Sequence, residues 1–125
     1  MTAADTIDDV DPIDRLRTYY DRVDDGDVDG LLSLFAEDVR YDRPGREPIE
    51  GIDALRRFYE RDRPLDDGTH DVHHVVVDGP FAAVRGEFTG RLDGKPVSFG
   101  FADHHEFDDD GLIATRYTYT DRDAV

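Results

Sequence analysis

The chain has 125 residues and a mass of 14.2 kDa, enough for one domain with a single hydrophobic core. Its formal net charge of −16 argues against nucleic acid and anionic lipid as partners, because both would repel it. The lack of cysteine excludes disulfides, thiolate catalysis and cysteine-ligated zinc, and no apolar run is long enough to span a membrane. The acidic N-terminal residues do not form a secretory signal, so we expect a soluble cytoplasmic protein.

The acidic residues are spread through the periodic segments, and Lys95 is the only lysine in the sequence. Molar salt shortens the Debye length to about 3 Å and screens the self-repulsion of such a chain. This composition resembles that of proteins from salt-accumulating haloarchaea, so we expect a halophilic archaeal source.

Residues 1–10 are predicted to form a disordered acidic tail before the first helix. Asp11 and Pro12 suit the cap and first position of that helix, and Gly26 ends it. Between them, apolar side chains recur at helical spacing: Ile13, Leu16, Tyr19, Tyr20 and Val23.

Two further helices are predicted. Asp27 can cap the second, in which Leu31, Leu34 and Phe35 would share one face. The third covers about residues 52–61, before Pro64 ends it.

Alternating apolar residues predict the strands. A short strand covers residues 39–43, and four longer ones follow at about 70–78, 81–91, 96–107 and 112–120. Gly-containing turns between the last four fit hairpins. Helices followed by an antiparallel meander indicate the α+β class.

Two blocks of sequence resemble a known family. Residues 19–38 contain Gly-Asp-x-Asp-Gly followed by Leu-Phe-Ala-x-Asp, and residues 101–107 read Phe-Ala-Asp-His-His-Glu-Phe. Both are similar to the ketosteroid isomerase and SnoaL-like branch of the nuclear transport factor 2-like superfamily. The resemblance implies a domain over residues 11–125, in which a curved antiparallel sheet and three N-terminal helices enclose a pocket. It also implies a homodimer through the sheet and a small-molecule ligand, without a cofactor or metal.

The resemblance also extends to single residues. Ketosteroid isomerases hold a substrate oxyanion with a tyrosine and a protonated aspartic acid, and these align with Tyr19 and Asp103. Their proton-moving aspartate aligns with Arg43. This departure argues against steroid-type isomerisation.

The alternation of the strands places the candidate pocket residues on inner faces. Asp103 shares a face with Phe99 and Phe101, and Arg43 shares one with Tyr41. An arginine beside Asp103 would keep the carboxylate ionised and would suit an anionic or carbonyl-bearing ligand. A structural Arg-Asp pair that closes the pocket floor is the alternative.

A histidine could replace the missing base. His105 shares the face of Asp103, and His70 opens the strand after the third helix. His73 and His74 point to opposite faces of a strand and do not form a chelating pair, so no metal is expected.

These patterns predict a small-molecule enzyme of the isomerase, cyclase or hydrolase type, acting on an oxygenated apolar substrate. Tyr19, Arg43 and Asp103 should converge on one pocket with His105, and Arg43 should lie within one hydrogen bond or one water of Asp103. The alternative is a non-catalytic ligand-binding or dimerisation module of the same fold.

Overall fold

A computed structural model describes residues 12–121, so the predicted acidic tail lies outside the described residues. The helices are α1 (Pro12–Asp25), α2 (Val28–Leu32), α3 (Ile52–Arg57) and a π-helical turn, η3 (Phe58–Asp62). The strands are β1 (Phe35–Asp42), β2 (Ile49–Glu50), β3 (Leu65–Asp78), β4 (Phe81–Leu92), β5 (Lys95–Phe107) and β6 (Ile113–Thr120). No helix among the described residues is long and apolar enough to cross a membrane.

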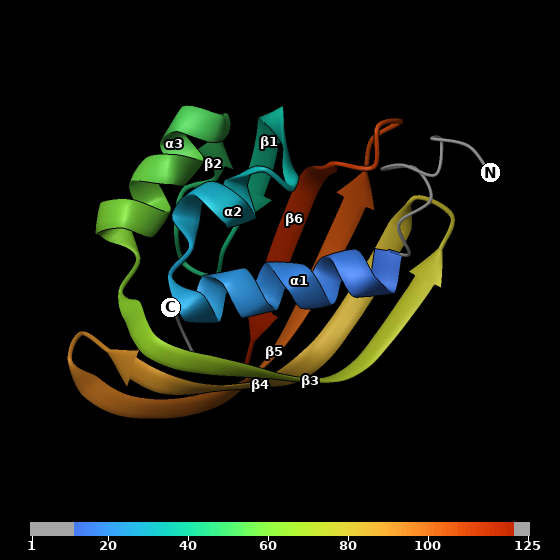
Figure 1. Ribbon diagram of the computed structural model, residues 1–125. Helices are drawn as coiled ribbons and strands as arrows, with labels where there is room; N and C mark the ends of the chain where they lie inside the picture. The colour runs from blue at the N-terminus through green and yellow to red at the C-terminus, as the bar shows by residue number, and fades with distance from the viewer. Residues whose placement is uncertain (1–11, 122–125) are drawn as a thin grey trace.

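The strands form one bent sheet in the order β2-β1-β6-β5-β4-β3. Figure 1 shows α1 lying across the concave side of this sheet, with α2 and α3 beside β1. The α+β class is therefore confirmed, but the expectation of an antiparallel sheet is wrong for one pair, because β1 and β6 run parallel. Between them the chain passes through α3 and three hairpin-linked strands, and such a long crossover permits parallel pairing.

The second helix is shorter than predicted. It ends at Leu32, and Phe35 begins β1 instead of sharing a helical face with Leu31. The physical reason is a pairing that local sequence does not reveal: the Leu34 carbonyl accepts from the amide of Ile113 at 2.9 Å. Tertiary pairing with β6 thus overrides helical periodicity at this point.

One hydrophobic core fills the space between the sheet and the helices. On β5 the buried residues alternate as predicted, at positions 99, 101, 103 and 105. Both tyrosines of α1, Tyr19 and Tyr20, are buried against this face. Four polar side chains are buried among these apolar groups: Asp103 and His105 on β5, and Arg116 and Thr118 on β6. They lie in or near the site described next.

Candidate functional site

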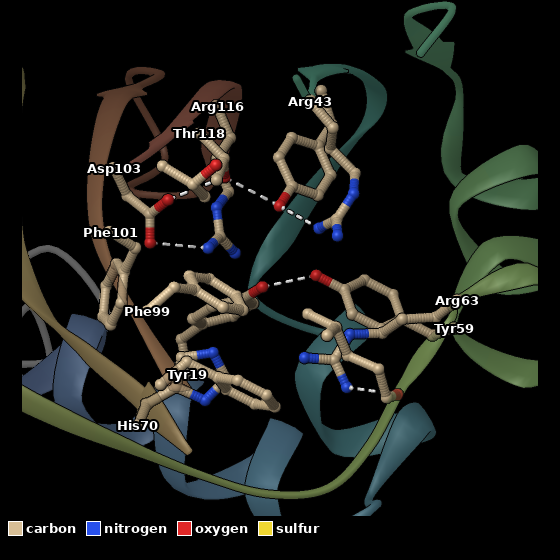
Figure 2. A pocket seen from close by; sticks show the side chains of 14 residues that line it. Tyr19, Arg43, Tyr59, Arg63, His70, Phe99, Phe101, Asp103, Arg116 and Thr118 are labelled. Atoms are coloured by element: carbon tan, nitrogen blue, oxygen red, sulfur yellow. Dashed lines mark hydrogen bonds and ion pairs between the residues drawn. The ribbon is translucent and has the colours of Figure 1, made fainter. Parts of the chain in front are cut away.

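A small cavity of about 20 Å³ lies between α1, η3 and the inner face of the sheet. This volume suits one water-sized group, since about 10–15 Å³ suffices for a water molecule. Its lining is formed by Tyr19, Tyr41, Arg43, Tyr59, Arg63, Leu65, His70, Phe88, Phe99, Phe101, Asp103, Arg116, Thr118 and Thr120. Figure 2 shows most of these side chains pointing toward a common space.

Asp103 forms a buried ion pair with Arg116 of the neighbouring strand. Arg116 Nη2 donates to Asp103 Oδ2 at 2.8 Å, and the side chains are 4% and 1% exposed. Tyr20 also donates to Oδ2, and Thr118 donates to Oδ1 at 2.6 Å. Burial raises the pKa of Asp103, and the hydrogen bonds from Thr118 and Tyr20 oppose this shift. The Arg116 guanidinium at 2.8 Å favours the ionised form of the carboxylate.

No hydrogen bond joins Arg43 directly to Asp103 among the described residues, so the direct form of the expected contact is wrong and its water-mediated form stays a prediction. Arg43 donates to the Tyr41 hydroxyl at 2.7 Å, and this hydroxyl lies 2.8 Å from Thr118 Oγ1. Two hydroxyl groups, those of Tyr41 and Thr118, therefore link Arg43 to Asp103. The reason is the strand order: β6 lies between β1 and β5, so its inward side chains separate the two residues.

The hydroxyl groups of Tyr19 and Tyr59 are hydrogen-bonded to each other in the cavity. Tyr59 is held by the π-helical turn η3, which ends where the amide of Arg63 donates to the Phe58 carbonyl at 2.8 Å. Burial raises the pKa of Tyr59 well above its ordinary value, so its hydroxyl stays protonated at neutral pH. Of the two hydroxyls, one donates to the other, and the acceptor keeps its own hydrogen for a third group.

His70 is oriented by an acidic partner on α1. Its Nδ1 lies 2.6 Å from Asp24 Oδ1, and its backbone amide donates to Asp24 Oδ2 at 2.8 Å. In a neutral ring, an Nδ1–H directed to the carboxylate leaves the lone pair on Nε2. The ring packs among Tyr20, Phe88 and Phe101, with centroid distances of 4.9 to 5.4 Å. His70 thus combines the orientation and the partner that a general base needs.

His105 does not line the cavity, contrary to expectation. Its ring is buried behind Tyr19, with a centroid distance of 6.5 Å. Burial lowers the pKa of His105 to about 3, so the ring is neutral at physiological pH. The backbone of Ala82 lies near the ring, but neither ring nitrogen has a hydrogen bond of normal geometry. A substrate in the cavity cannot reach His105, which leaves His70 as the candidate base.

A larger cleft adjoins the cavity. It has a volume of about 430 Å³ and lies where the end of α1, α2, η3 and the start of β3 meet. Tyr59, Arg63 and Leu65 line both spaces and form the wall between them. Asp24 lines the cleft while its partner His70 lines the cavity, so the ion pair connects the two.

Several important residues were missed at the sequence level. Arg116 and Thr118 alternate on the inner face of β6, and this period-two spacing was the one available signal. Tyr59 and Arg63 could not be found, because a π-helical turn changes which side chains share a face. Among residues 12–121 no group of three or more histidine or acidic side chains could hold a metal ion.

Comparisons with known proteins agree with this architecture. An epoxide hydrolase of the LEH-like type from M. tuberculosis matches with a TM-score of 0.77 and 19% identity, covering 88% of this chain and 82% of that one. SalBIII, an epoxide hydrolase/cyclase-like enzyme in pyran ring formation in the polyether salinomycin, matches with a TM-score of 0.78 and 20% identity, covering 92% and 94%. A candidate ketosteroid isomerase from Kribbella flavida matches with a TM-score of 0.74 and 27% identity, covering 89% and 78%.

These likenesses establish the nuclear transport factor 2-like fold, which hosts different chemistries. The model of the SnoaL-like domain matches residues 16–116, which is most of the chain. The protein therefore belongs to the SnoaL-like domain family.

Proposed function

We propose that this protein is a small-molecule enzyme that moves a proton on an oxygenated, largely apolar substrate, with His70 as the base. The observation that supports this most strongly is the Asp24–His70 pair, which directs an oriented imidazole toward the cavity. Arg43 stands at the position of the isomerase base, and a guanidinium is not a general base. The names of the similar structures, which include hydrolase, cyclase and isomerase, support the same general class.

The two spaces divide the task of binding. The cleft of about 430 Å³ is within the range of roughly 300–1,000 Å³ typical of ligand pockets, so it holds the body of the substrate. The cavity of about 20 Å³ accepts only its reactive oxygen. There the Tyr19–Tyr59 hydroxyl pair donates to that oxygen, and the Arg116 guanidinium stabilises the negative charge that develops on it.

The proposed step moves one proton through His70 while bonds of the substrate rearrange. His70 Nε2 takes a proton from carbon or from an attacking water, and the electron pair moves toward the substrate oxygen. Asp24 stabilises the imidazolium that results. In an isomerisation the same proton returns to a different carbon. When water or a substrate hydroxyl opens an epoxide, the new C–O bond forms as the epoxide C–O bond breaks, and the proton passes from His70 to the alkoxide that is released. Neutral His70 is regenerated in both cases without an external oxidant.

Replacement of His70 tests this assignment. We expect His70→Gln to lower turnover by roughly 10²–10⁴-fold, because the positioned base is lost. Nuclear magnetic resonance in D₂O can follow deuterium uptake next to the carbonyl of enolisable ketones, and mass spectrometry can follow the opening of epoxides. His73→Gln, an exposed position on the same strand, is the matched control and should keep full activity.

The alternative is a binding module, and the small volume of the inner cavity favours it. The same ketone and epoxide panels separate the two functions. If compounds raise the melting temperature of the wild type but neither exchange nor opening occurs, the protein binds and does not catalyse. Equal turnover by His70→Gln and the wild type would show that the base is a different group.

A second copy of the chain is the partner that we propose for the outer face of the sheet. Large apolar side chains are exposed there, and Val76, Phe81 and Tyr119 are 64%, 55% and 57% exposed. A groove of about 330 Å³ runs over β3 to β6 beside them, and Asp78 and Glu106 are the only acids among its lining residues. In a chain of net charge −16, a surface with so few charges is suited to self-association.

We expect Phe81→Asp to convert the dimer into a monomer in molar salt, because each interface would bury two uncompensated carboxylates. Sedimentation velocity measures the change. Lys95→Gln alters the net charge by the same amount at a hairpin and should remain dimeric.

We also expect the wild-type dimer to dissociate or unfold in dilute buffer, because less salt is then present to screen the repulsion between its acidic residues. A wild type that is monomeric in molar salt would refute the interface.

A further inference from the structure

The clearest unexplained feature of the molecule is a buried guanidinium with unused donors. Arg116 is 3% exposed, and only its Nη2 is engaged, by Asp103. Its Nε and Nη1 are buried without any hydrogen-bond partner. Buried polar groups of native proteins nearly always find a partner, and leaving a charged one unpaired is costly. Arg116 lines the inner cavity, so its missing partner belongs there.

The surroundings of these donors determine what kind of group can satisfy them. The guanidinium carbon lies 4.2 Å from the Tyr19 ring centroid and 4.8 Å from that of Tyr41, so the two rings hold it in place. The Tyr19–Tyr59 pair adds one hydroxyl hydrogen, and Figure 2 shows this pair beside the Arg116 guanidinium. The cavity therefore offers donors from Arg116 and from the tyrosine pair.

The charge of the lining favours an anion over a water molecule. The carboxylate in the lining, Asp103, is balanced by Arg116 and already accepts from Tyr20, Arg116 and Thr118. Arg63 brings a second guanidinium to the cavity from the opposite side. Burial lowers the pKa of Arg116 to about 9 and also lowers that of Arg63, so a nearby anion would stabilise their charged forms.

We propose that the inner cavity is a binding site for a compact monovalent anion, held by Arg116 Nε and Nη1 and by the Tyr19–Tyr59 hydroxyls. The volume of about 20 Å³ suits a halide ion or one oxygen of a carboxylate that extends into the cleft. A halide ion and a carboxylate oxygen both present a small, negatively charged atom to the cavity. The site does not depend on proton transfer, so it can exist whether or not His70 is a base.

Thermal unfolding at constant sodium concentration tests the site, because non-specific screening is then equal. Sodium chloride, bromide and formate are compared with sodium isethionate, whose anion is too large for the cavity. Above its dissociation constant, a bound anion should raise the melting temperature by roughly 5 °C for each tenfold increase in concentration. This rise in melting temperature should be smaller in the variants Arg63→Gln and Tyr59→Phe, which change the lining of the cavity but keep the Asp103–Arg116 pair. It should persist in Arg85→Gln on the outer sheet face.

Anomalous diffraction from crystals grown in bromide locates the ion directly. We expect a peak at hydrogen-bond distance from Arg116 Nη1, and displacement of this peak by formate would identify carboxylates as ligands too. If formate leaves the peak unchanged, the site is specific for halides. Cavity density without anomalous signal, or equal melting temperatures in chloride and isethionate, would overturn the proposal. Neither measurement involves turnover, so a negative result for the anion site can be distinguished from a failure of the proposed catalysis.

Discussion

Arg116→Met is expected to lower the free energy of unfolding by about 3–5 kcal/mol, the typical cost of removing one partner of a buried ion pair. Asp103 would remain buried with a negative charge and with hydroxyl donors from Tyr20 and Thr118 alone. Because the Arg116 guanidinium also packs on Tyr19, part of the loss comes from missing contacts. The remaining carboxylate should take up a proton at higher pH than in the wild type.

Denaturant unfolding at neutral pH measures this effect, and a double-mutant cycle with Asp103→Asn isolates the pair. The double variant should be more stable than Arg116→Met alone, since no unpaired charge is left inside. Arg85→Met, on the outer sheet face, should change stability by less than about 0.5 kcal/mol. A loss below about 1 kcal/mol for Arg116→Met would mean that the carboxylate is compensated elsewhere.

His105 should make the protein sensitive to acid. Its pKa is about 3 in the folded protein, against 6.5 in the unfolded chain, because burial disfavours the imidazolium. Between these two values the unfolded chain binds a proton that the folded protein does not. The contribution to stability is therefore constant above pH 6.5 and is lost as the pH falls toward 3. The slope is about 1.4 kcal/mol per pH unit, which amounts to about 3 kcal/mol at pH 4.5.

His105→Leu should remove this part of the pH dependence. We expect its free energy of unfolding to match or exceed that of the wild type at pH 4.5, whereas the two should differ little at pH 7. Urea unfolding of both proteins at a series of pH values measures the difference in slope. His104→Leu, the adjacent exposed position, should keep the wild-type slope. Parallel pH profiles for His105→Leu and the wild type would show that the imidazole is not buried in its neutral form.

Local patterns were sufficient for most of the fold. Pro12 and Gly26 mark the ends of the first helix because their backbone preferences act within a few residues. Strand alternation placed Asp103 on the inner face of β5, since a shift by one residue would expose Phe99 and Phe101 as well. The same logic placed Tyr41 and Arg43 inward, and all of these residues line the cavity.

The sequence by itself thus determined the fold class, the ends of the first helix and the inward face of β5, because these depend on neighbouring residues and on periodicity. Only the tertiary structure decided the pairings. Strand order put Arg116, not Arg43, beside Asp103, and the packing of α1 on β3 joined Asp24 to His70 across 46 positions. These contacts depend on which elements become neighbours in space, and that is a property of the whole chain and not of any local segment.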